Sequence, residues 1–391
     1  MKKDLKLMTL RSCWPARNRI LAIALSTLVL AIGAEPLHAA NVTYIVGTCR
    51  SGTRFSTIQA ALNASPAPNT VQVCPGQYPE QITITKPVTL QGISVNNQAQ
   101  ARIVTPAGGL LVNASVNSGE GVPDPAAVQI YVKDVNGPVN LANLDINGIA
   151  NGQSGSGAFV IGVLYQQTSG TINHIVSFNQ NGQSTVGWGI FLEGGSTNPS
   201  ITVENSVLHD FSQGAIWAIG DTTTPDLTVT IKGNYISSSS QTTYNVVAEE
   251  GINATISGNV ITGGLVGINV TAPEGTVSGN TIIGSLFGID LNVDGVSLRS
   301  NNIEGTVDAG ITIFAPSLST SAVQNNIIRS VTNPNQGGGT GIDLNCKSIS
   351  SSLVHSNTIM DALFGYGDAP TGFAGANTYV EVGTEIDVSC N

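Results

Sequence analysis

A short stretch of the chain repeats itself after 21 residues, and this repeat constrains the fold more than any other feature. The segment ISGNVI (256–261) returns as VSGNTI (277–282), and GINV (267–270) returns as GIDL (288–291). Self-similarity at a period of about 20 to 50 residues is typical of solenoids and propellers. One unit of such a fold cannot bury its own apolar face, so the units stack and share a continuous core.

Asparagine marks the same point of each repeat. It lies three residues after one apolar residue and two before another, at Asn234, Asn259, Asn280, Asn301, Asn326 and Asn357. Upstream, the same register points to Asn143, His174 and Asn205. Asparagine suits a tight turn between strands, because it tolerates left-handed backbone and its amide can bond to the asparagine stacked on it. We therefore expect an asparagine ladder, with a turn role for His174.

Leucine-rich repeats share this period and are the rival fold. Residues 256–303 contain four Leu but thirteen Ile and Val, and they lack the runs of Ala, Glu or Lys that would form a helix. Short β-branched segments punctuated by Gly, Asn and Ser are typical of strands and turns. The sequence predicts an all-β solenoid, a parallel β-helix whose coils stack at about 4.8 Å, forming one domain over residues 40–391.

The first 39 residues have the pattern of a cleavable secretory signal peptide. Six basic residues precede an apolar run over residues 20–32, and small residues follow it, ending in LHAA (37–40). The apolar run is too short to span a membrane as a helix. We expect residues 1–39 to be removed and the rest to be a bacterial secreted or periplasmic protein with no membrane contact.

Without those 39 residues the chain is strongly acidic. It keeps nine of the 15 Lys and Arg and 23 of the 25 Asp and Glu, a net charge near −14. Such a field repels nucleic acid and anionic membranes. It also disfavours the capture of polyuronates unless cations bridge them.

Four cysteines remain in this exported part: Cys49, Cys74, Cys346 and Cys390. An even number in an exported chain favours disulfides, for which three pairings exist. Two cysteines lie near each end, which favours Cys49–Cys74 and Cys346–Cys390. Free buried thiols are the alternative.

The beginning of the domain differs from the repeats. Residues 55–65, FSTIQAALNAS, place apolar side chains at helical spacing, so a short capping helix is expected over the open end of the stack. The IQAAL helix (58–62), the VQVCPGQYPE segment (71–80) and the KPVTLQG strand (86–92) resemble the opening of right-handed parallel β-helix proteins of the pectin-lyase-like superfamily. This resemblance implies the fold. It does not indicate a function, because the superfamily includes lyases, hydrolases, esterases and adhesins.

Motifs of individual enzyme families are absent. The Asp-Phe of pectin methylesterases occurs once, at Asp210-Phe211, but in a different context, and none of the polygalacturonase motifs is present. Pectate lyases need an arginine base with calcium-binding acids beside it. The nine basic residues of this chain are dispersed, which argues against a pectate lyase. Some members of the superfamily take part in copper maturation, which needs soft or imidazole ligands. Beyond residue 39 this chain offers only Met360 and three histidines of these kinds, which argues against a copper site. If the protein is an enzyme, we expect the activity of a glycoside hydrolase or of a polysaccharide lyase.

A candidate site emerges when the repeats are aligned on a recurring Gly-Ile corner, in which Gly214-Ala215 takes the place of Gly189-Ile190. The third and fifth positions should then point to solvent from one sheet. The candidate catalytic acids there are Asp290, Asp343 and Glu249, with Asp290 and Asp343 two coils apart, about 9.6 Å. The candidate substrate-binding residues are Asn269, Thr271, Asn292, Asn345, Phe191 and Phe314, the two Phe as exposed platforms for sugars. Trp188 and Trp217 are assigned to packing.

Two functions fit this pattern. The first is binding or cleavage of a neutral or weakly charged polysaccharide or cell-surface glycan on the strand face, without a cofactor or with calcium on its acidic row. The second is a rigid, adhesin-like rod without catalysis that meets its partner through the surface loops 105–126 and 331–340. A solvated acidic face with no ligand is the plainest alternative. We expect a monomer.

Overall fold

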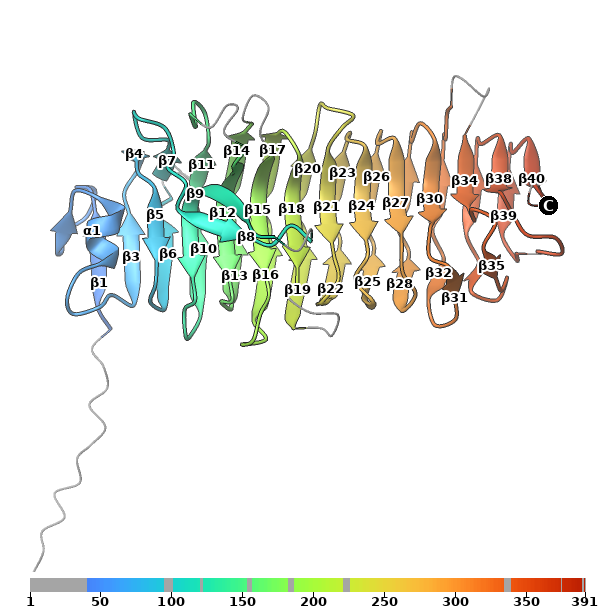
Figure 1. The fold of residues 1–391 in the computed structure, drawn as a ribbon. Coiled ribbons are helices and arrows are strands. Elements are labelled where there is room, and N and C mark those ends of the chain that lie inside the picture. Colours follow the sequence, from blue (N-terminus) through green and yellow to red (C-terminus); the bar gives the residue numbers. More distant parts are fainter. Residues whose placement is uncertain are drawn as a thin grey trace, which may run out of the picture. The chain divides into compact units, whose positions relative to one another are not determined.

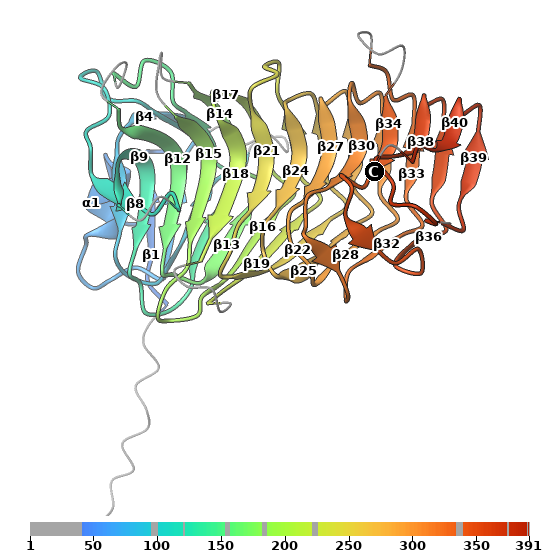
Figure 2. The same cartoon turned by 45° about the vertical axis from the view of Figure 1, so that its right-hand side comes forward.

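The computed structural model describes residues 41–94, 101–119, 122–152, 157–181, 186–220, 226–333, 339–373, 375–388 and 390. The predicted signal peptide, residues 1–39, lies outside them. Residues 41–391 form one compact unit, in which the chain winds through three strands per turn. After β3 (Thr70–Val73), β4 (Gly76–Pro79) and β5 (Ile82–Ile84), strand β6 (Val88–Gly92) returns to pair in parallel with β3. Repetition of this turn makes a parallel β-helix (Figures 1 and 2).

Each coil adds a strand to three parallel sheets, which we call sheets A, B and C. Sheet A contains, in spatial order, β2 (Arg54–Phe55), β1 (Thr43–Val46), β3, β6, β10 (Val139–Ala142), β13 (Gly170–Asn173), β16 (Ser200–Glu204), β19 (Leu227–Lys232), β22 (Ile252–Ser257), β25 (Glu274–Ser278), β28 (Val296–Arg299), β32 (Ala322–Gln324) and β36 (Val354–His355). Sheet B contains β4, β7 (Ala101–Val104), β11 (Asp145–Asn147), β14 (Val176–Gln180), β17 (Val207–Phe211), β20 (Tyr235–Ser237), β23 (Val260–Thr262), β26 (Thr281–Ile283), β29 (Asn302–Glu304), β33 (Ile327–Arg329), β37 (Thr358–Met360) and β39 (Thr378–Val380).

Sheet C carries the candidate site. It contains β5, β9 (Asp124–Lys133), β12 (Phe159–Gln166), β15 (Gly187–Glu193), β18 (Gly214–Ile219), β21 (Tyr244–Ala248), β24 (Val266–Val270), β27 (Phe287–Leu291), β30 (Ala309–Ile313), β34 (Thr340–Asp343), β38 (Phe364–Gly367) and β40 (Thr384–Ile386). Strand β8 (Ala114–Val116) pairs with β9 in the antiparallel direction. A separate pair joins β31 (Ser317–Leu318) to β35 (Ser348–Ile349).

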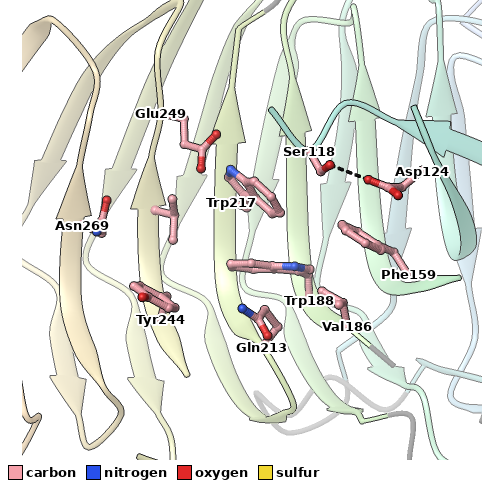
Figure 3. Close-up of a pocket in the computed structure, with 11 residues that line it drawn as sticks. Ser118, Asp124, Phe159, Val186, Trp188, Gln213, Trp217, Tyr244, Glu249 and Asn269 are labelled. Carbon is pink, nitrogen blue, oxygen red and sulfur yellow. Dashed lines mark hydrogen bonds between the residues drawn. The ribbon is translucent and has the colours of Figure 1, made fainter. Parts of the chain in front are cut away.

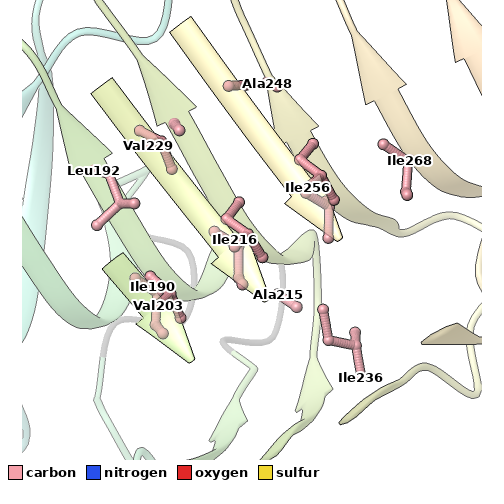
Figure 4. Packing of buried hydrophobic residues seen from close by; sticks show 14 of the residues in the cluster. Ile190, Leu192, Val203, Ala215, Ile216, Val229, Ile236, Ala248, Ile256 and Ile268 are labelled. Atoms are coloured by element: carbon pink, nitrogen blue, oxygen red, sulfur yellow. The ribbon is translucent and has the colours of Figure 1, made fainter. Parts of the chain in front are cut away.

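The core consists of apolar columns that run along the inside of the coils. In sheet B the register stacks Ile236, Ile261, Ile282, Ile303, Ile328 and Ile359, and each is fully buried. Figure 4 shows how side chains from neighbouring coils, such as Ile256 and Ile236, fill this interior. Branched side chains pack well when stacked in this way. The observed columns confirm the predicted all-β solenoid and the predicted spacing of its apolar residues.

The asparagine ladder forms as predicted and satisfies buried backbone groups. Asn259 Nδ2 donates to Asn280 Oδ1 at 2.9 Å, and Asn280 Nδ2 donates to Asn301 Oδ1 at 3.0 Å. The backbone N–H of Asn259 donates to the same Asn280 oxygen, and Asn280 Nδ2 also reaches the carbonyl of Ile256. The ladder extends through Asn326 and Asn357 to Asn377.

The left-handed backbone, however, belongs to the residue before each ladder asparagine from Asn234 to Asn357. Gly258 and Gly279 have φ of 63°, and Ser300 has φ of 55°. Upstream, Asn143, His174 and Asn205 have φ of 54°, 52° and 50°, so they correspond to these glycines and not to the ladder. The predicted register is therefore wrong by one residue there, although His174 does lie in a turn.

The N-terminal end holds the helix α1 (Ile58–Leu62). Thr57 is its N-cap and accepts from the N–H of Ala60, while the carboxylate of Glu80 accepts from the N–H groups of Ile58 and Gln59 at 2.8 and 2.9 Å. Acceptors of this kind satisfy the free donors of a first helical turn. Its apolar face joins the main core. That it shields the strand edges stays a prediction.

Both predicted disulfides are present, Cys49–Cys74 and Cys346–Cys390. An ion pair joins Lys232 to Glu204 of the preceding coil at 2.9 Å, as expected for a shared column of sheet A. No helix in the described part of the chain is long and apolar enough to cross a membrane.

Candidate active site

The outward side of sheet C is not uniformly solvated. Over β9, β12, β15 and β18 it carries a second apolar cluster, separate from the core, which we call the outer cluster. Val116 of β8 belongs to it, as do Tyr131, Leu164 and Phe191. Phe191 is completely buried, so its prediction as an exposed sugar platform is wrong. The segment around β8, predicted as a surface loop, pairs with β9, and its Val116 belongs to the same cluster as this ring.

Where the outer cluster ends, the sheet opens into a pocket of about 450 Å³, which we call the aromatic pocket (Figure 3). Strands β12, β15, β18, β21 and β24 supply most of its walls, and the segment between β8 and β9 supplies the rest. The lining residues are Ser118, Asp124, Phe159, Val186, Trp188, Gln213, Trp217, Tyr244, Val247, Glu249 and Asn269. Trp217 lies 4.8 Å from Trp188 and 6.3 Å from Phe159, measured between ring centroids.

Glu249, immediately after β21, has the chemistry of a proton donor. Burial raises the pKa of its carboxyl to about 7, the Trp217 indole lowers it, and the negative charge of Glu250 raises it further. The indole N–H faces Glu249 in Figure 3 but falls short of a well-formed hydrogen bond. A carboxyl with a pKa near neutrality is suited to general acid catalysis.

Asp124 places a second carboxylate on the pocket wall. It begins β9, and its Oδ2 accepts a hydrogen bond from the hydroxyl of Ser118. Gly119, which follows Ser118, lies close to Glu249. A methyl group built on the Cα of Gly119 would lie 3.4 Å from Glu249 Oε2. Ser118, Gly119 and Asp124 therefore form a lip at the edge of the pocket, and Asp124 is one of the pocket's acids.

Two hydrogen-bond donors in the pocket lack a well-formed hydrogen bond. The indole nitrogens of Trp188 and Trp217 are buried, and neither has a well-formed hydrogen bond within the part of the chain that the structure describes. A buried donor left unpaired costs about 1–3 kcal/mol. A ligand that offers oxygen acceptors would recover this energy, and the aromatic rings would meet its apolar faces.

The chemistry of the pocket is that of neutral, oxygen-rich ligands. Among its described lining residues there is no Lys, Arg or His to neutralise an anion. The amides of Gln213 and Asn269 and the phenol of Tyr244 add neutral polar groups. The described residues of the pocket combine carboxyl acid–base groups with ring surfaces, and none of them is cationic.

The sequence placed two of these residues at the site and missed the others. Glu249 and Asn269 were predicted to face solvent from sheet C, and both line the pocket. The alignment at Gly214-Ala215 was wrong by one residue, because Ile216, and not Ala215, pairs with Ile190. With the correct register Trp217 takes the outward position and Ile216 the interior one. Trp188 and Trp217, assigned to packing, thus also form pocket walls.

Asp290 and Asp343 lie in one outward column, separated by Thr312, as predicted. Their surroundings differ. Asp343 lines a separate recess of about 280 Å³ with Asp308, Asp368 and Asp387, whereas Asp290 is only 6% exposed and lines neither recess. The prediction of a solvent-facing Asp290 is wrong, since neighbouring side chains cover it.

Burial gives Asp290 an unusual titration. It raises the pKa of this carboxyl to about 7; Thr312 lowers it and the charge of Asp343 raises it. Neither Asp290 Oδ1 nor Thr312 Oγ1 has a well-formed hydrogen bond among the described residues. Ionisation of Asp290 above pH 7 therefore destabilises the folded state.

We expect Asp290→Asn to stabilise the protein at pH 8. The folded-state pKa lies above the ordinary value of 3.8, so the wild-type protein loses stability as pH rises from about 4 to about 7. Removing the charge should recover up to about 4 kcal/mol of unfolding free energy at pH 8, and the difference should vanish toward pH 4. Urea unfolding across this range measures it. Asp361→Asn, at an exposed turn, is the control, and equal stability of Asp290→Asn and wild type at pH 8 would contradict the assignment.

The remaining predicted binding residues lie along the open part of sheet C. The side chains of Thr271, Asn292 and Asn345 reach carbonyl groups of the preceding coil at 3.4 to 3.5 Å, so each helps to hold the stack. Phe314 is 43% exposed, which agrees with its predicted outward position.

No preformed site for calcium is found among the described residues. In the part of the chain that the structure describes, one group of three His, Cys, Asp or Glu side chains has ligand atoms within 4.8 Å of one another. It consists of Cys346, Asp368 and Cys390, and a disulfide joins its two sulfur atoms. Calcium on the acidic row stays a prediction.

Comparison with known proteins supports the fold. The family model described as "Right handed beta helix region" matches residues 222–379. The chain has the fold of a right-handed parallel β-helix. A comparison of this β-helix protein with curated sequences gives no match.

Solved structures with the same fold share little sequence with it. A GH136 lacto-N-biosidase from Eubacterium ramulus has a TM-score of 0.57 at 10% identity, covering 89% of this chain and 68% of that one. A PL6 alginate lyase in complex with a trisaccharide has 0.52 at 15% identity, covering 90% and 81%. A tailspike protein mutant of E. coli bacteriophage HK620 in complex with a hexasaccharide has 0.50 at 13%, covering 81% and 59%. At these identities the likeness shows the fold alone.

Proposed function

We propose that this protein binds a neutral or weakly charged glycan in the aromatic pocket and hydrolyses a glycosidic bond there. The observation that carries the proposal is the presence of Glu249, with its pKa raised to about 7, beside the two buried indoles of one pocket. Sugars present apolar C–H faces to rings and oxygen atoms to N–H donors, and the pocket offers both.

Glu249 acts as the general acid. It donates its proton to the glycosidic oxygen as the bond to the anomeric carbon breaks, and it is left as a carboxylate. Asp124 is the second carboxylate, and the Ser118 hydroxyl orients it. It supports the positive charge that develops on the sugar. Water then adds its hydroxyl group to the anomeric carbon, and its other proton returns to the Glu249 carboxylate.

Hydrolysis is favoured over a lyase reaction because elimination acts on uronates, whose carboxylate needs neutralising. The described lining residues include no cation, and the net charge near −14 beyond residue 39 repels such substrates. The GH136 and tailspike structures carry names or ligands of carbohydrate chemistry, which supports a carbohydrate ligand in general. The two disulfides agree with action outside the cytoplasm, secreted or in a periplasm, after loss of residues 1–39.

A glycan-array screen of residues 40–391 tests the ligand class, run with calcium and then with a chelator. We expect binding to one class of neutral glycans and weak or no signal on polyuronates and sulfated glycans. Binding that the chelator removes would support the calcium proposal for the acidic row. Strong binding to polyuronates only, or no binding under either condition, would contradict the proposal and favour the adhesin-like rod.

The pH dependence of turnover should report the proton on Glu249. Because the general acid must be protonated, turnover of a glycan found in the screen should fall about tenfold per pH unit above pH 7. Initial rates from pH 5 to pH 9 measure this limb. A profile that stays flat from pH 6 to pH 9 would show that Glu249 does not donate the proton.

A further inference from the structure

The aromatic pocket is closed on one side along the axis of the solenoid. Toward the N-terminal coils, the outward residues Tyr131, Leu164 and Phe191 are buried in the outer cluster together with Val116 of β8. The lip residues Ser118 and Asp124 stand on this same side (Figure 3). A glycan that enters the pocket therefore cannot continue toward the N-terminal coils along the sheet.

On the other side, equivalent outward positions follow one another coil by coil. Beyond Glu249 the outward edge of sheet C carries Thr271, Asn292 and then Phe314, one on each successive coil. Their backbone N–H groups donate in turn to the preceding coils, from Thr271 to Ala248, from Asn292 to Val270 and from Phe314 to Leu291. Phe314 thus lies three coils beyond Glu249, about 14 Å by stacking.

We propose that the pocket receives the end of a glycan chain, and that the chain leaves toward the C-terminal coils with Phe314 as a distant binding subsite. This inference rests on the proposed function. The spacing of coils is close to the length of one sugar unit along a chain, so Phe314 meets a sugar roughly three residues from the cleaved bond. The 43%-exposed ring offers a stacking face, while Thr271 and Asn292 border the path between.

Two consequences follow for catalysis. Cleavage removes a unit of fixed size from one end of the chain, because the blocked side admits only a terminal segment. Long substrates gain affinity from Phe314, whereas short ones that fill only the pocket do not.

Kinetics on oligosaccharides of increasing length test the subsite. The probes are disaccharides to octasaccharides of the neutral class bound on the array, drawn from cello-, xylo-, malto- and chito-oligosaccharides labelled at the reducing end. We expect Phe314→Ala to raise KM about tenfold for pentasaccharides and longer chains, with kcat and the KM of disaccharides unchanged. Phe314→Trp should retain the wild-type KM, and Ile327→Ala, an equally exposed apolar residue on sheet B, should have no effect.

The product pattern tests the chain-end mode. Early in the reaction, one product of fixed size should accompany a substrate shortened by that size. A ladder of internal fragments, or an equal KM change for all chain lengths in Phe314→Ala, would overturn this inference while leaving the proposed function standing. Loss of the proposed function is recognised separately, by wild-type protein that turns over none of the probes or by Glu249→Gln that cleaves them normally.

Discussion

Replacing Glu249 by glutamine should lower turnover of the cleaved glycan by about 10²–10⁴-fold, the range over which a positioned general acid contributes. The amide keeps the size of the side chain and its contact with Trp217, but it has no proton to donate. The raised pKa of Glu249 places that proton in the working range of the pocket. Binding of the intact glycan should remain within a few-fold of wild type, because the aromatic walls are untouched.

The measurement is single-turnover hydrolysis at pH 6, with glycan binding measured on the same preparation. Glu274→Gln on sheet A is the matched control, since Glu274 is exposed and does not line the aromatic pocket. It should keep wild-type rates. If Glu249→Gln turned over the glycan at more than a tenth of the wild-type rate, Glu249 would not be the general acid.

Replacing Asn280 by alanine should give the largest loss of stability, about 3–5 kcal/mol of unfolding free energy. Asn280 Oδ1 accepts from both the backbone and the side chain of Asn259, and its Nδ2 donates to the carbonyl of Ile256. Asn280 is completely buried, so water cannot replace these bonds, and the truncation interrupts the ladder in the middle of the stack.

Urea unfolding followed by circular dichroism measures this loss. Asn253→Ala, at an exposed position of β22 in the neighbouring coil, should change the unfolding free energy by less than about 0.5 kcal/mol. A similar small change for Asn280→Ala would mean that the ladder contributes little and that the apolar columns hold the coils alone.

The fold could be predicted because every coil repeats the same physical requirement. Each Ile of the sheet B column and each ladder asparagine occupies an equivalent environment, so one residue type recurs at a readable interval. The register failed where the repeat loosens. At Gly214-Ala215 a small residue takes the place of the glycine of Gly189-Ile190, and the shift by one residue hid the outward position of Trp217.

The candidate site could be predicted only in part, because two of its lining residues lie outside the repeat. Glu249 and Asn269 follow the periodic pattern and were found from it. Asp124 and Ser118 come from the insertion before and within β9, which has no counterpart in other coils, so no spacing indicated where they would fold. The burial of Phe191 and Asp290 depends on what covers them, and a column of outward positions does not contain that information.

The most direct test is a crystal structure of Glu249→Gln soaked with an oligosaccharide found on the array, five or more sugars long. We expect the chain end against the exposed faces of Trp188 and Trp217, with a glycosidic oxygen beside Gln at position 249 and the far sugars over Phe314. A glycan bound on sheet A or B, or in the recess lined by Asp308, Asp343, Asp368 and Asp387, would contradict the assignment of the aromatic pocket as the active site.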